Sequence, residues 1–142
     1  MKKLIVIILI LVIGIYVIST TVFNDIKGSK FSTYEEALTT IEKGWIPEDL
    51  PKAAEKIYEV HDLDSNNGNG KFYLPKEDIK KFIISLEKTD REKLLKKEQV
   101  KAKWWNESKI KESIKNGDLI LGERKGFIYA VDKEGIVYYW IK

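Results

Sequence analysis

Apolar residues form one long run near the start of the chain. The segment Leu4–Phe23 contains no charged residue, and at about 1.5 Å per residue its length approaches the roughly 30 Å hydrocarbon core of a bilayer. Lys2 and Lys3 precede the segment and no basic cluster follows it directly, which by the positive-inside rule places the N-terminus in the cytoplasm. The pattern predicts a transmembrane anchor over residues 1–23. The expected location is the cell (inner) membrane, as a single-pass protein with its C-terminal domain in the periplasm or outside the cell.

A cleaved signal peptide is the alternative interpretation of this segment. Val17 and Ser19 can serve as the small residues before a cleavage site. The apolar run is longer than the roughly 7–15 residues of a usual signal peptide, which favours the anchor. Both interpretations export the rest of the chain. Residues 24–30 are polar and include a glycine, which predicts a short tether.

The pattern after the tether predicts one α+β domain over residues 31–142. Ser32 and Glu35 form a capping-box pattern, and the apolar spacing behind them predicts a helix that ends before Gly44. Two prolines within Trp45–Pro51 predict a rigid turn. The other predicted elements are a short helix that becomes a strand over 53–63, a strand over 71–74, a helix from Pro75, an exposed charged helix after Thr89, a helix over 108–115, and an antiparallel three-strand meander at 119–121, 127–131 and 136–141.

The composition excludes several kinds of chemistry. The chain has no cysteine, which rules out disulfides, thiolate metal sites and a cysteine nucleophile. Lys2 and Lys3 account for two of the 25 basic residues, so the rest of the chain is nearly neutral against its 22 acidic residues. A nearly neutral domain lacks the basic footprint of a nucleic-acid-binding protein, and no nucleic-acid partner is expected.

One loop resembles a metal-binding sequence. Asp62, Asp64 and Asn66 alternate oxygen ligands, as the start of an EF-hand calcium loop does. The match then fails, because Asn67 occupies the position of the invariant glycine and Tyr73 occupies that of the bidentate glutamate. The first three residues are therefore candidate ligands for weakly bound calcium. A hairpin loop rich in asparagine and glycine is the alternative, and no other cofactor is expected.

A dispersed acid/base site is the second candidate. His61 is the only histidine, and Glu59 and Asp62 are close to it in sequence. Such a group can serve a small hydrolase as general acid and base. The chain contains no nucleophile elbow, zinc-protease, P-loop or dinucleotide-binding motif. An enzyme is therefore not favoured, and no catalytic residue is assigned.

Aromatic residues suggest a binding surface. Trp104 and Trp105 lie in the basic segment Arg91–Lys115, while Tyr138 and Trp140 lie on the last predicted strand. Basic and aromatic side chains together suit anionic lipid head groups or a cell-wall polyanion. A solvated helix with one tryptophan in the core is the alternative.

The middle third of the chain resembles small uncharacterised bacterial proteins that are membrane-anchored or exported. The resemblance implies a location in the bacterial envelope, and it supplies no activity, cofactor or catalytic residue. The residues that carry it are Trp45-Ile46-Pro47, Leu50-Pro51, Ala54, Ile57, His61-Asp62-Leu63-Asp64 and Asn66.

These observations predict a membrane-anchored extracytoplasmic domain that acts by binding. The expected partners are the lipid bilayer, through residues 4–23, and another envelope protein. The absence of catalytic motifs leaves recognition as the least demanding role. The alternatives are a weak calcium-dependent module and a small hydrolase.

Overall fold

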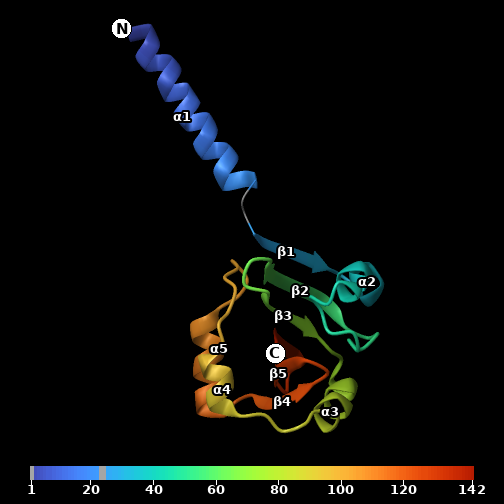
Figure 1. The fold of residues 1–142 in the computed structure, drawn as a ribbon. Helices are drawn as coiled ribbons and strands as arrows, with labels where there is room; N and C mark the ends of the chain where they lie inside the picture. The colour runs from blue at the N-terminus through green and yellow to red at the C-terminus, as the bar shows by residue number, and fades with distance from the viewer. Residues whose placement is uncertain (1, 23–24) are drawn as a thin grey trace.

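The computed structural model describes residues 2–22 and 25–142, with side chains described over 3–19 and 25–142. Figure 1 shows an N-terminal helix that stands apart from a domain built on one sheet, with helices on both faces of that sheet. The elements are α1 Lys2–Val22, β1 Ile26–Phe31, α2 Tyr34–Glu42, β2 Glu55–Asp62, β3 Asn67–Tyr73, α3 Lys76–Ile84, α4 Arg91–Lys96, α5 Glu107–Asn116, β4 Ile120–Arg124, β5 Phe127–Val131 and β6 Ile136–Ile141.

The N-terminal helix α1 does not meet the requirements for the transmembrane anchor that the sequence predicted. Its large apolar side chains, from Leu4 to Ile18, are each at least half exposed. Over residues 2–22 and 25–142, no helix is both long enough and apolar enough to cross a bilayer. The uninterrupted apolar run ends at Ile18, before Ser19, and is shorter than the about 20 residues that a span requires. Phe23, the end of the predicted span, lies outside the described residues.

The predictions that depended on this span are overturned with it. These are the transmembrane anchor, the single-pass topology with a cytoplasmic N-terminus, and the location of the domain on the outer side of the inner membrane.

The predicted tether is also corrected, because most of it is an edge strand. β1 pairs antiparallel with β2 over its whole length, from Ile26 opposite Asp62 to Phe31 opposite Ile57. Asn24 lies outside the described residues. The sheet domain therefore includes residues that precede residue 31, where the sequence had placed its start.

The α+β class is confirmed by a six-stranded antiparallel sheet. Its strand order is β1-β2-β3-β6-β5-β4. The C-terminal meander is confirmed as β4, β5 and β6, which pair in sequence order. β6 then pairs with β3 and joins the meander to the N-terminal strands. One continuous sheet thus connects two regions that are far apart in the sequence.

Local signals place the helices close to their predicted positions. The cap of α2 is Thr33, whose side chain accepts from the Glu36 N–H at 3.5 Å, while the Glu36 carboxylate accepts from the Ser32 N–H at 2.7 Å. The arrangement is a variant of the predicted capping box, moved by one residue, in which the carboxylate bonds the N–H of the residue before the cap. The helix predicted at the start of residues 53–63 is absent, because the strand β2 occupies residues 55–62.

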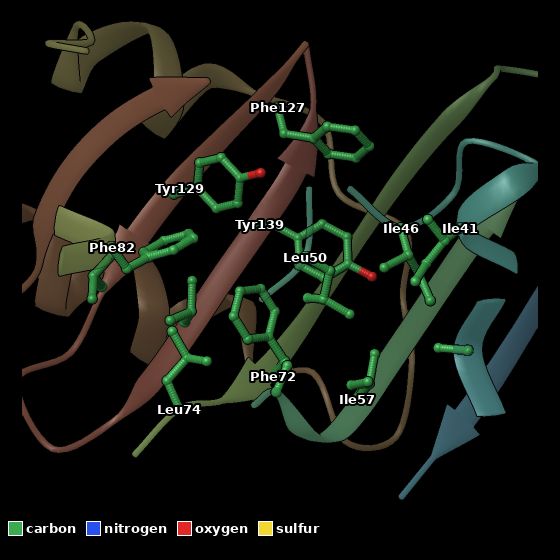
Figure 2. Packing of buried hydrophobic residues seen from close by; sticks show 14 of the residues in the cluster. Ile41, Ile46, Leu50, Ile57, Phe72, Leu74, Phe82, Phe127, Tyr129 and Tyr139 are labelled. Carbon is green, nitrogen blue, oxygen red and sulfur yellow. The ribbon is translucent and has the colours of Figure 1, made fainter. Parts of the chain in front are cut away.

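The first core fills the space between the sheet and the helices α2 and α3. Figure 2 shows the rings of Phe72, Phe82 and Tyr129 turned toward one another. The Phe82 ring meets the other two edge-on, with centroid distances of 5.8 Å to Phe72 and 5.2 Å to Tyr129. Because this edge-to-face geometry is favourable, the cluster fixes α3 against the middle of the sheet.

The second core lies on the opposite face of the sheet, beneath α4 and α5. Trp140 of β6 is fully buried, and its ring meets Trp105 at 5.5 Å. Asn69 on β3 accepts from the Val100 N–H at 2.6 Å and donates to the Val100 carbonyl at 3.2 Å. These bonds tie the segment between α4 and α5 to the sheet. Side chains on both faces of β5 are therefore in a core, and all five of its residues are buried.

Candidate functional site

The strand β2 presents a different group of side chains on each face of the sheet. Successive side chains of a strand point to opposite faces, so Glu59 and His61 share one face while Tyr58 points to the other. The first face leads to a pocket beside α2, and the second leads to a row of lysine and aromatic side chains.

We call the row the lysine–aromatic strip. Most of it lies on three neighbouring strands. Lys30 of β1 is opposite Tyr58 of β2, and Tyr58 is in turn opposite Lys71 of β3. Its aromatic members are partly exposed, as is Lys71, and the two other lysines are exposed. The strip consists of Lys30, Lys56, Tyr58, Lys71, Tyr73 and Trp104.

Each lysine of the strip lies over an aromatic ring. The Lys71 Nζ is 5.2 Å from the Tyr58 ring centroid, 6.0 Å from that of Tyr73 and 5.9 Å from that of Trp104. Lys30 lies 5.4 Å above Tyr58, and Lys56 lies 5.5 Å above Tyr73. These distances are within the range of cation–π attraction, which holds the cationic groups against the sheet.

A backbone irregularity places Lys56 in the strip. The pairing of β2 with β3 shifts register between Glu55 and Tyr58, and Lys56 has a φ of 48°. A positive φ is unusual for a residue with a long side chain. Bulges of this kind redirect a side chain, and here the redirected side chain is the one over Tyr73.

The strip has uncompensated positive charge. Over the described part of the chain, no ion pair joins Lys30, Lys56 or Lys71 to a carboxylate. Partial burial lowers the pKa of Lys71, and the nearby Lys30 lowers it further. A negative group placed against the strip would relieve this repulsion. The arrangement therefore suits an anionic partner with apolar surface for the rings.

The four predicted surface aromatics are divided between this region and the core. Trp104 belongs to the strip, and its ring is 5.3 Å from that of Tyr58. Tyr138 is partly exposed and lies opposite Lys71 on the neighbouring strand. Trp105 and Trp140 are buried in the second core, at 8% and 0% exposure, and cannot contact a partner. No local sequence pattern predicts this division, because it depends on which rings α4 and α5 cover.

The predicted calcium ligands form a hairpin turn between β2 and β3. The Asp62 carboxylate accepts from the Asp64 N–H at 3.0 Å and from the Ser65 hydroxyl at 2.8 Å, and these bonds lower the pKa of Asp62. Asn66 has a φ of 54°, a conformation that asparagine tolerates. Among the described residues, no three His, Cys, Asp or Glu side chains gather as a metal site. Weak calcium binding at Asp62, Asp64 and Asn66 stays a prediction.

The predicted acid/base group is present only in part. Glu59 Oε2 is 2.8 Å from His61 Nδ1, and both residues are buried, Glu59 at 1% and His61 at 8% exposure. Burial raises the pKa of Glu59, while His61 and, to a smaller extent, the nearby Ser29 act in the opposite direction. Asp62 points to the other face of β2 and forms the turn just described. The pair therefore lacks the third group of the predicted hydrolase site.

Trp45 completes the surroundings of His61. The indole is stacked on the imidazole, with ring centroids 3.9 Å apart and planes 9° from parallel. A pocket of about 360 Å³ opens beside this stack. It is lined by Lys27, Ser29, Thr40, Lys43, Trp45, Glu59, His61 and Leu63.

Comparison with known proteins gives one partial similarity. Residues 25–73 match the family model of the YbbD head domain. The matched region runs from β1 to the end of β3, about a third of the chain, and includes the pocket and all of the strip except Trp104. No curated protein and no solved structure matches the chain. The match carries no information on activity, and the resemblance to small bacterial envelope proteins stays a prediction.

Proposed function

We propose that the sheet domain is a protein-binding domain that holds an acidic segment of its partner along the lysine–aromatic strip. The observation that carries the proposal is the placement of Lys30, Lys56 and Lys71 over aromatic rings without a carboxylate partner in the described part of the chain. Aromatic side chains are enriched in protein interfaces, where they supply contact area with little loss of conformational entropy.

The chemistry of the strip favours a polypeptide as the ligand. The rings offer apolar surface for the stem of a partner residue, while the ammonium groups offer charge to a carboxylate. Three cationic groups are too few for the affinity that phosphate contacts give to a nucleic-acid-binding protein. The partner is therefore expected to be a protein with aspartate or glutamate next to apolar residues.

A charge-matched pair of variants tests this proposal. We expect the triple variant Lys30→Gln, Lys56→Gln, Lys71→Gln to bind labelled poly-L-glutamate about tenfold more weakly than the unchanged protein, because each exposed ion pair contributes about 0.2–1 kcal/mol. Fluorescence anisotropy at two salt concentrations measures the affinity, and the difference should shrink as salt screens the charges.

The control changes the same net charge elsewhere. Lys52, Lys80 and Lys133 are exposed, and replacing all three with glutamine should leave the affinity nearly unchanged. Equal losses in the two triple variants would show that binding depends on net charge and not on the strip. Crosslinking from a photoreactive residue at position 73 in the native cell would then identify the partner protein.

A further inference from the structure

The pocket beside α2 is separate from the lysine–aromatic strip, because the two lie on opposite faces of β2. Its volume of about 360 Å³ is within the roughly 300–1,000 Å³ of small-molecule sites. Ionisable side chains line it, two of them buried. Buried charged groups in a protein normally have ion-pair or hydrogen-bond partners. The groups in this pocket that lack such a partner indicate which ligand it can bind.

Glu59 lines the pocket, and only one of its two carboxylate oxygens is hydrogen-bonded among the described residues. Glu59 Oε2 is bonded to His61 Nδ1, but Glu59 Oε1 is buried and has no hydrogen-bond partner among the described residues. An unpaired buried acceptor loses its bonds to water without replacement. A ligand that donates a hydrogen bond to this carboxylate would supply the missing interaction. The stack of Trp45 on His61 holds the pair in place.

Two lysines give the pocket positive charge. Lys27 on β1 lies directly opposite His61 in the sheet register, and Lys43 caps the end of α2. Both side chains are exposed and line the pocket. In the part of the chain that the structure describes, neither forms an ion pair with a carboxylate. These ammonium groups favour an anionic group on the ligand.

We propose that this pocket binds a small carboxylate ligand that carries a hydroxyl or ammonium group next to its carboxylate. Lys27 and Lys43 bind the ligand carboxylate, and Glu59 accepts a hydrogen bond from the neighbouring donor. A single negative charge suits the site better than a phosphate dianion, because Glu59 repels additional negative charge at short range.

An NMR titration with matched probes tests the proposal. Lactate and propionate differ by one hydroxyl, and glycine and acetate differ by one ammonium. Because His61 is the only histidine, its imidazole gives a single set of ring resonances that reports binding without assignment. We expect lactate or glycine to bind at least about tenfold more tightly than its matched partner, since a hydrogen bond to a charged group is a strong one.

Four variants test where the probes bind. Lys27→Ala and Lys43→Ala should each weaken lactate or glycine binding several-fold, while Lys133→Ala, at an exposed position outside the pocket, should not. Glu59→Gln should reduce the difference between the matched probes. The proposal is overturned if no probe moves the His61 resonances at concentrations on the order of 50 mM, well above the millimolar dissociation constants of weak sites. Equal affinity within both pairs, or unchanged affinity in both lysine variants, would also overturn it.

Discussion

Trp140→Ala is expected to lower the free energy of unfolding by about 3–5 kcal/mol, the usual cost of removing a large aromatic side chain from a core. Trp140 is fully buried in the second core, where its ring contacts Trp105. It lies opposite Ile128 on β5 and Asn69 on β3. A cavity at this position would loosen the contact between α5 and the sheet. Urea denaturation followed by tryptophan fluorescence measures the change.

The neighbouring tryptophan provides the matched control. Trp104→Ala makes the same chemical change at a partly exposed position, and we expect it to cost less than half as much because no closed cavity remains. The indole N–H of Trp140 has no hydrogen-bond partner among the described residues. Trp140→Phe removes that unpaired donor, and its cost should therefore lie between those of the two alanine variants. Equal losses for Trp104→Ala and Trp140→Ala would contradict the assignment of the second core.

The sequence predicts those elements whose signal is local. Local geometry marks the ends of several elements whatever the tertiary arrangement. Examples are the capping residues at the start of α2, the glycine after α5 and the glycine in the β5–β6 turn. Gly117 and Gly135 indeed have positive φ values of 79° and 113°, which glycine adopts without steric cost. The three strands of the meander and the α+β class were therefore predictable.

The N-terminal strands β1 and β2 were harder to predict because their sequences lack a regular alternation of polar and apolar residues. β1 contains lysine, glycine and serine, which is suited to an exposed edge that must not pair with other chains, but also to a linker. In β2 buried apolar residues lie on both faces, because Ile57 and Val60 are both buried, and the strand therefore lacks a clear polar and apolar alternation. Its apolar positions fit a helical stripe equally well, which is why a helix was expected there.

The same ambiguity limited the prediction of the sites. Glu59 and His61 are two residues apart, and once β2 is known to be a strand, period two puts them on one face and Asp62 on the other. The lysine–aromatic strip needs the register of three strands and a bulge at Lys56, none of which a local pattern specifies. The stack of Trp45 on His61 brings a loop residue against a strand residue, and no local sequence pattern predicts such a contact.

Gly70→Ala is expected to cost about 3 kcal/mol, at the upper end of the range for overpacking a core. A Cβ at this position would lie 2.3 Å from both the Tyr139 hydroxyl oxygen and the Tyr58 carbonyl oxygen. Tyr139 is fully buried, so its ring has no free space beside it to move into; the same burial raises the pKa of its hydroxyl well above the ordinary value. The strands β2 and β3 would have to separate to admit the methyl group.

Gly28→Ala is the matched control for this substitution. It places a methyl group on the edge strand β1 of the same sheet, where the nearest atom is the Glu59 carbonyl oxygen at 3.2 Å. A slight movement of an edge strand relieves that contact, and alanine restricts the unfolded chain more than glycine does, so we expect a change within about 1 kcal/mol. Thermal unfolding of the two variants measures the difference. Similar melting temperatures for the two variants would show that Tyr139 and the Tyr58 carbonyl oxygen do not fill the space over Gly70.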